Sequence, residues 1–253
     1  MGIGNNIREA IALFDPITLD KMDRVQLMKR TDTKFVFSTK HLPELLHKAK
    51  DEYFMVEIKN EREQIYKTTY FDTADYLMYN FHHNGKLNRH KIRIRKYVYS
   101  EQEFLEVKRK NNKGETIKNR IPHQNDVVQI NENTSNEFVD RFTPYHTNTL
   151  EPTLDNKFIR LTLVNKNFSE RITLDYKIKF TDLRHNLKAK TKGVCIAEVK
   201  RGRDSEKSSF LSYLREMRIN SMGFSKYCIG MALLNPDVKN NLFKQRLRSI
   251  IKI

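Results

Sequence analysis

The feature that most constrains the fold is a set of short segments in which charged and apolar residues alternate. Residues two apart on a β-strand face the same side of a sheet. Segment 89–99 therefore predicts a strand with one cationic face and one apolar face. Ile92, Ile94 and Val98 share the apolar face, and the cationic face carries Arg89, Lys91, Arg93, Arg95 and Tyr97.

The same alternation recurs along the chain and predicts an α+β fold dominated by antiparallel strands. We expect eight strands, at 30–37, 65–72, 89–99, 102–110, 115–121, 157–164, 170–180 and 194–200. Helical spacing and capping residues predict helices at 5–14, 41–50, 208–218 and 224–234. The polar region 122–151 reads as a long connection or insertion.

Carboxylates accompany the cations at a fixed spacing on three of these strands. The pairs are Asp32-x-Lys34, Glu106-x-Lys108 and Glu198-x-Lys200. Lys118 and Arg120 share a face of segment 115–121, and segment 170–180 aligns Arg171, Thr173, Asp175, Lys177 and Lys179. The charged face of the expected sheet is therefore mainly cationic, with a few carboxylates set among the cations.

Two structures fit this pattern. One is an ordinary antiparallel sheet with a wet face. The other is a closed barrel with a charged lumen and an apolar outside covered by helices. Like charges that face each other across strands are destabilising unless an anion lies between them. A lumen of Lys and Arg suits a linear chain of phosphates, and carboxylates within it suit a divalent metal bound to those phosphates.

Composition limits the kinds of ligand that the protein can bind and the cellular compartment in which we expect it. The chain has 253 residues and a formal net charge of +16, so it should bind a polyanion. It has no apolar stretch long enough to span a membrane and no export signal, and its two cysteines give no disulfide framework. We expect a cytoplasmic protein that forms a single domain, residues 1–253, with a helical lead-in at 1–28. The basic tail 241–253 is expected either to pack on the barrel or to contact an anionic membrane.

Several short segments, in this order along the chain, resemble the VTC domain. They include RTDTKFVF (30–37), HKIRIRKY (90–97), LEVKRK (105–110), IAEVKRG (196–202) and GFSKYCIG (223–230). The VTC domain is the polyphosphate polymerase domain of the triphosphate tunnel metalloenzyme, or CYTH-like, superfamily. The resemblance implies an eight-stranded antiparallel tunnel, which agrees with the strand count.

The resemblance also implies roles for particular residues. By analogy with the family, the catalytic cations are Lys34, Arg93, Arg95, Lys108, Lys118 and Lys226. Arg89 and Arg160 match further phosphate-binding positions, and the alternation adds Lys91, Arg120 and Lys200. Glu198 matches the ligand of a catalytic Mn²⁺ or Mg²⁺, and the alternation offers Glu106, Asp32 and Asp175 as further metal ligands.

The chain departs from the family at two places. Phe158 stands where the family has a tyrosine, so one hydrogen bond to phosphate is missing. The first strand reads Arg30-x-Asp32-x-Lys34, whereas the hydrolase branch has glutamate in the first position. The second departure resembles the polymerase branch.

The expected function is therefore transfer of the terminal phosphate of ATP to a growing polyphosphate chain inside the tunnel. Two alternatives stay open. One is a tunnel triphosphatase, in which water attacks and a carboxylate such as Glu106 or Asp32 acts as the base. The other is a protein that binds polyphosphate or another polyanion without catalysis. An RNA-binding sheet is disfavoured because Phe35, Phe37, Tyr176 and Phe180 fall on the face opposite the cations.

Overall fold

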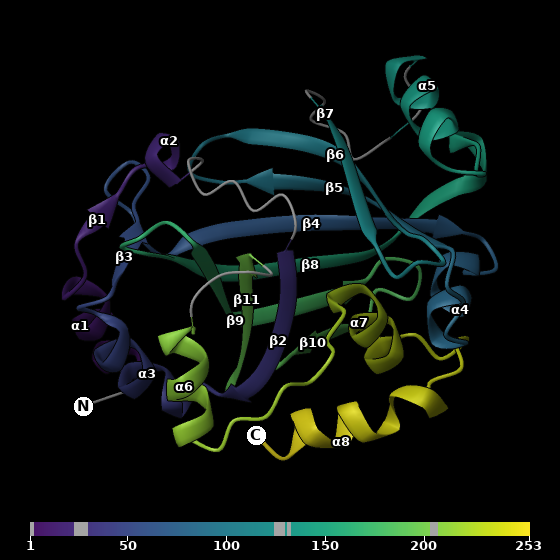
Figure 1. Ribbon diagram of the computed structural model, residues 1–253. Coiled ribbons are helices and arrows are strands. Elements are labelled where there is room, and N and C mark those ends of the chain that lie inside the picture. The colour runs from purple at the N-terminus through teal and green to yellow at the C-terminus, as the bar shows by residue number, and fades with distance from the viewer. Residues whose placement is uncertain (1–2, 23–29, 124–129, 131–132, 203–206) are drawn as a thin grey trace.

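Eight strands form one curled antiparallel sheet, and helices pack on both of its faces (Figure 1). The computed structural model describes residues 3–22, 30–123, 130, 133–202 and 207–253. The strand order is β2-β11-β9-β8-β4-β5-β6-β7. Their bounds are β2 (Arg30–Ser38), β4 (Gln64–Thr73), β5 (Arg89–Tyr97), β6 (Gln102–Lys110), β7 (Thr116–Pro122), β8 (Leu150–Asn165), β9 (Glu170–Asp182) and β11 (Val194–Gly202).

Three short strands extend the sheet at its margins. They are β1 (Pro16–Ile17), β3 (Tyr53–Val56) and β10 (Lys188–Lys190). The α-helices are α1 (Ile3–Ala12), α2 (Leu19–Met22), α3 (Leu42–Ala49), α4 (Leu77–His83), α5 (Asn133–Phe142), α6 (Ser209–Glu216), α7 (Lys226–Leu234) and α8 (Lys244–Ile251). Short 3₁₀ turns are η1 (Thr39–His41), η2 (Thr147–Thr149) and η3 (Asn241–Phe243).

The predicted α+β fold with eight antiparallel strands is confirmed. The division into a single domain with a lead-in remains a prediction. One region differs from expectation, because 122–151 is not only a connection. It contains α5, which buries Phe138 and Val139 against a core patch shared with β5 and β6. The polar composition of this short helix hides its narrow apolar stripe.

The convex face of the sheet carries apolar patches that helices cover. One large cluster joins α1, α3 and α6 to the outward residues of β8, β9 and β11. Leu161, Leu174, Cys195 and Ala197 lie in it, and each is fully buried. This arrangement agrees with the expected apolar outside covered by helices.

The concave face has an apolar end as well as a charged one. Helix α7 packs there on Leu154, Phe158 and Phe180. Gly230 allows this close approach, because a Cβ at that position would lie 2.6 Å from Leu154 Cδ2 and 2.7 Å from Phe180 Cδ1. One end of the hollow is therefore filled by α7, and the charged side chains occupy the rest.

The expected alternation in β9 is wrong beyond Asp175. Lys177 has a φ of 51°, and the pairing of β8 with β9 shifts register between Lys157 and Ile159. The extra residue forms a β-bulge, which reverses the faces of the residues that follow. Lys177 and Lys179 therefore lie exposed on the convex side, and Ile178 and Phe180 pack on the concave side with α7.

We predict that Gly230→Ala lowers the free energy of unfolding by about 1–3 kcal/mol, because the added methyl overpacks the contact between α7 and the sheet. Gly4→Ala in α1 is the matched control, since no atom lies within 4 Å of its Cβ position. The control should be neutral or stabilising by up to about 1 kcal/mol, because Ala is the better helix former. Urea denaturation measures both, and equal effects would contradict the close packing of α7.

Candidate functional site

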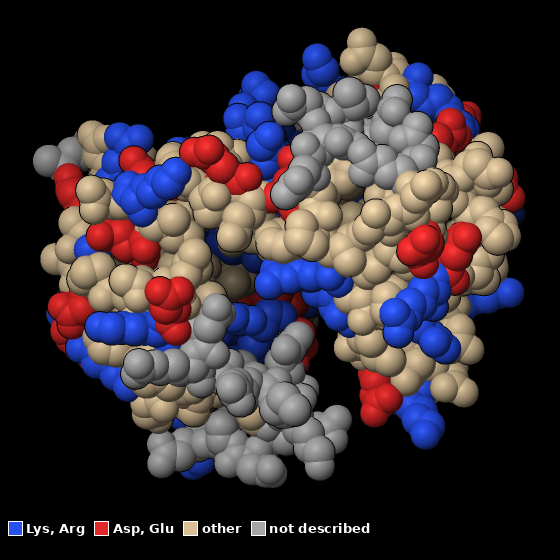
Figure 2. Space-filling view, turned by 90° about the horizontal axis from the view of Figure 1, so that it is seen from above, with Lys and Arg blue, Asp and Glu red and all other residues tan. Residues whose placement is uncertain are grey.

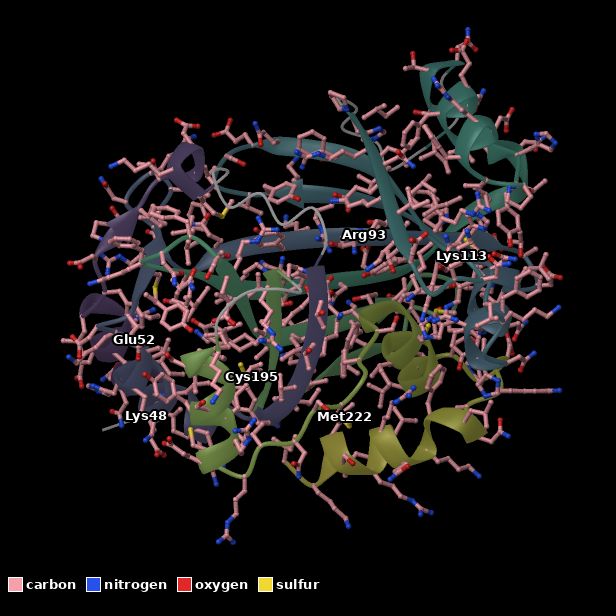
Figure 3. The ribbon with its side chains drawn as sticks, viewed as in Figure 1. Lys48, Glu52, Arg93, Lys113, Cys195 and Met222 are labelled. Carbon is pink, nitrogen blue, oxygen red and sulfur yellow. The ribbon has the colours of Figure 1, made fainter. Side chains whose placement is uncertain are left out.

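The charged part of the concave face is a hollow lined with basic side chains. Figure 2, seen from above, shows Lys and Arg side chains inside a depression near the middle of the molecule. Arg93 lies near the centre of the sheet (Figure 3). The strands bring together most of the predicted site residues, namely Lys34, Lys91, Arg93, Arg95, Lys108, Lys118, Arg160, Lys200 and Lys226 with Asp32, Glu106, Asp175 and Glu198.

Glu106 holds two of these cations. It stands opposite Arg93 in the pairing of β5 with β6, and Glu106 Oε2 accepts from Arg93 Nε at 2.7 Å. Lys118 of β7 pairs with the other carboxylate oxygen. Burial alone would raise the pKa of Glu106, but Arg93, Arg95 and Lys118 hold it well below its usual range. Glu106 therefore stays ionised and fixes the Arg93 guanidinium.

Asp175 holds a second pair of cations. Arg160 donates to both carboxylate oxygens, at 2.6 and 2.7 Å, and Lys226 at the start of α7 pairs with Oδ2. Burial favours the neutral carboxyl, but Arg160 and Lys226 outweigh it and lower the pKa of Asp175. The bidentate contact ties β8 to β9, and Lys226 brings a residue from far along the chain into the hollow.

Glu198 and Asp32 share a third group of cations. Lys34 Nζ lies 2.5 Å from Glu198 Oε1, and Lys200 Nζ lies 2.9 Å from Glu198 Oε2. The same Lys200 ammonium lies 2.8 Å from Asp32 Oδ2. Burial opposes ionisation of Glu198, but Lys200 and Lys34 hold its pKa well below the usual range.

Three cations in the hollow have no carboxylate partner among the described residues. Lys91 Nζ donates to Ser225 Oγ at 2.8 Å, and Arg95 Nε donates to Thr68 Oγ1 at 3.2 Å. Lys108 makes no hydrogen bond or ion pair within the described part of the chain. Burial lowers the pKa of Lys108 to about 7, with Lys34, Lys91 and Arg93 acting in the same direction and the charge of Glu198 opposing them. An anion between these groups would offset the cost of burying them.

Arg89 and Arg120 lie at the edge of the site. Arg89 donates to the backbone carbonyl of Lys86 at 2.7 Å. Arg120 is exposed, and its guanidinium lies 4.4 Å from the Phe104 ring. Neither makes an ion pair with a carboxylate of the hollow in the described region, so their phosphate-binding roles remain predictions.

Phe158, at the position of the missing tyrosine, lies within the site. Its ring stacks on Tyr66 with centroids 5.2 Å apart, and Lys226 Nζ lies 4.3 Å from it. The side chain of Arg30 lies outside the described residues. Sequence reasoning missed Ser225 and Thr68, which orient Lys91 and Arg95. Ser225 fell inside the helix expected at 224–234, whereas in the structure it is the N-cap residue of α7. Its partner on a distant strand had no local signal.

The carboxylates fit the predicted divalent metal in one arrangement. In the described residues, no group of three or more His, Cys, Asp or Glu side chains could hold a metal ion. Asp32 and Glu198, however, already hold the Lys200 ammonium between them. Mg²⁺ is commonly bound by one or two carboxylates together with substrate phosphates. These two residues therefore suit a divalent ion whose remaining ligands are phosphate oxygens and water.

A comparison with protein families decides the assignment of the chain. The protein-family model described as the VTC domain matches residues 29–235. The chain belongs to the VTC domain family. The resemblance seen in the short sequence segments is therefore confirmed. A comparison with curated proteins gives no match.

Solved structures with similar folds have low sequence identity to this VTC domain. A candidate adenylate cyclase from Vibrio parahaemolyticus is 13% identical, with a TM-score of 0.49, and the match covers 81% of this chain and 99% of that one. A Hippeastrum protein, for which a dominant triphosphatase activity is described, is 15% identical with a TM-score of 0.48, covering 83% and 99%. The PH1819 protein from Pyrococcus horikoshii is 16% identical with a TM-score of 0.45, covering 81% and 98%.

The basic tail forms η3 and α8, which pack on the body of the protein. Phe243 and Ile250 are buried in the cluster around α7. Lys244, Arg248 and Lys252 stay exposed, and their contact with an anionic membrane remains a prediction. None of the described helices has the length and apolar character required to cross a bilayer.

We predict that Lys108→Met raises the free energy of unfolding at pH 7 by about 1–3 kcal/mol. Folding lowers the pKa of Lys108, so between about pH 7 and pH 10 the unfolded chain binds more protons than the folded one. In the wild type, the energetic cost of burying the charged Lys108 therefore falls as the pH rises. The difference in free energy of unfolding between the variant and the wild type should shrink accordingly. Urea denaturation at pH 7, 8 and 9 measures it, with Lys40→Met as the exposed control. A difference independent of pH would contradict the account.

Proposed function

We propose that this VTC domain is a polyphosphate polymerase that transfers the terminal phosphate of ATP to a polyphosphate chain. The observation that carries the proposal is the excess of buried and half-buried cations in one hollow. Lys91, Arg95 and Lys108 lack carboxylate partners in the described structure, while other cations are held in fixed positions by Glu106, Asp175 and Glu198. A linear chain of phosphates supplies the missing negative charge along the whole hollow.

The cations have different tasks in this proposal. Arg93 and Arg160 are oriented by bidentate or paired contacts, so their guanidinium groups can grip two phosphate oxygens in a fixed geometry. Lys34, Lys108, Lys118 and Lys226 act as point charges that neutralise nonbridging oxygens. A divalent ion on Glu198 and Asp32 would neutralise charge on the leaving diphosphate. Catalysis is then mostly positioning and electrostatic stabilisation.

The acceptor in this reaction needs no protein base. The end of a polyphosphate chain is itself an anionic nucleophile, so attack on the terminal phosphorus of ATP releases ADP without removal of a proton. Glu106 and Asp175 are poor bases, because each is ionised with a lowered pKa and is held by two cations. These contacts favour transfer to phosphate over attack by water.

The direct test is to incubate the purified protein with ATP and Mn²⁺ and to assay long-chain polyphosphate and free phosphate in the same tube. We expect long chains with little free phosphate. Glu198→Gln should lower the rate by about 100-fold or more, because a metal ligand is lost. Glu9→Gln, an exposed carboxylate on α1, should have no effect.

The other outcomes of this assay separate the alternatives. Free phosphate without chains would replace the polymerase with a triphosphatase. Tight binding of polyphosphate with neither product, over several donors and metals, would leave a binding protein.

We predict that Glu106→Gln lowers kcat by about tenfold or more without changing the shape of the pH–rate profile. Glu106 acts by positioning Arg93 and Lys118, so its loss misplaces two phosphate contacts. Steady-state rates from pH 6 to pH 9 measure this effect. Loss of the acidic limb of the profile would show instead that Glu106 acts as a base, as a triphosphatase requires.

A further inference from the structure

Five lysines form a continuous row across the convex face, outside the hollow. Lys67 pairs in register with Lys96 of β5 on one side and with Lys157 of β8 on the other. Lys157 pairs in turn with Lys179 of β9, and Lys179 pairs with Lys190 of β10. We call this row, Lys96, Lys67, Lys157, Lys179 and Lys190, the lysine ladder.

The ladder lies on the face opposite the hollow. Its strand neighbours Thr68 and Arg95 meet each other in the hollow, so Lys67 and Lys96 point the other way. Asn156 and Phe158 flank Lys157, and Phe158 contacts Lys226 on the concave side. The bulge at Lys177 is what brings Lys179 into the row, because it reverses the faces in β9.

The ladder is exposed and its positive charges outnumber the carboxylates beside it, which are Glu103 next to Lys96 and Asp155 in the flanking row. All five lysines are exposed. In the described part of the chain, one has an ion pair, between Lys96 Nζ and Glu103 Oε2 at 3.6 Å. Like charges directly opposite each other destabilise a sheet, and here the arrangement is repeated over four successive strand pairs. A single solvated lysine needs no explanation, but five in exact register form one line of charge.

The geometry of the line indicates a linear ligand. Neighbouring strands lie about 4.8 Å apart, so the five Cα positions span about 19 Å. A single phosphate can contact only one or two of these ammonium groups. A flexible chain of phosphates laid across the strands can contact all five.

The surroundings disfavour nucleic acid and membrane as the occupant. Single-stranded nucleic acid is held by exposed aromatic side chains as well as cations, and a bilayer surface by exposed apolar ones. None of the large apolar side chains that are exposed in the described region lies on the strand segments that carry the ladder. The row is flanked instead by Thr69, Asp155 and Thr181 on one side and by the half-buried Ile65 and Ile159 on the other.

We infer that the lysine ladder is a second binding site for polyphosphate, on the convex face of the sheet. The choice of polyphosphate as the ligand rests on the proposed function, but binding to the ladder does not require catalysis. The site would retain a long polyphosphate chain on the surface of the enzyme, while the tunnel binds the triphosphate end.

The test compares two triple variants of equal net charge in the absence of ATP. The ladder variant is Lys67→Gln, Lys157→Gln and Lys179→Gln, and the control is Lys40→Gln, Lys239→Gln and Lys244→Gln, all at exposed lysines. Affinity is measured by titration calorimetry for long-chain polyphosphate, tripolyphosphate, single-stranded RNA and anionic lipid vesicles at several salt concentrations.

We expect the ladder variant to bind long-chain polyphosphate about tenfold more weakly than the wild type. The slope of log K against log salt should fall by about 2, since three charges are removed. Tripolyphosphate, which the proposed function places in the hollow and which is too short to span the ladder, should bind as before. The control should change long-chain affinity less than twofold.

Three results would overturn the inference. One is an equal loss of long-chain affinity in both triple variants. Another is a loss of tripolyphosphate affinity in the ladder variant, which would place the effect in the tunnel. The last is ladder-dependent binding of RNA or of anionic vesicles as tight as that of polyphosphate.

The thermal unfolding midpoint of the ladder variant shows whether that variant is folded. Removing like charges that face each other should leave this midpoint unchanged or raise it. Should the triple variant fail to fold, Lys157→Gln alone, at the centre of the row, should weaken long-chain binding by about two- to threefold. An absence of polymerase activity with ladder-dependent binding intact would remove the proposed function and keep the site.

Discussion

The structure depends on placing an excess of positive charge, most of it half-buried, on the concave face of a curled sheet. In the described residues, nine cationic side chains share the hollow with four carboxylates. Burying a charge is costly unless it is paired and hydrogen-bonded. Glu106, Asp175 and Glu198 each pair with two cations, which makes the cluster compatible with a folded chain. Within that described part of the chain, Lys91, Arg95 and Lys108 have no such partner, so the hollow favours an anion.

The same ion pairs also determine the shape of the site. Asp175 links β8, β9 and α7, and Glu106 links β5, β6 and β7. A side chain held in this way is ordered before the substrate arrives, so binding loses less conformational entropy. The packing of α7 on the apolar end of the concave face brings Lys226 to Asp175. Packing of α7 therefore completes a site that is otherwise built on strands.

Much of the sheet and of its charged face could be predicted from the sequence, because every second residue of a strand faces the same side. Alternation alone placed Arg93, Arg95 and Lys108 on one face, and the pairing of β5 with β6 agrees. The prediction from alternation failed at Lys177, where a single bulge exchanges the faces of the residues that follow in β9. A bulge leaves no clear signal in a run of alternating residues. The prediction also missed α5, whose apolar stripe is narrow. The joining of Lys226 to Asp175 and of Lys91 to Ser225 required the family resemblance or the structure, because no local pattern relates residues so far apart.

The central claim is that the buried cations without partners are balanced by bound phosphate. The most direct measurement is the number of protons taken up when tripolyphosphate binds at pH 8, from calorimetry in buffers of different ionisation enthalpy. The pKa of Lys108 is about 7 in the free protein, so a bound anion should raise it and draw a proton from solution. The account predicts greater proton uptake by the wild type than by Lys108→Met. Equal uptake by the two proteins, with equal affinity, would contradict it.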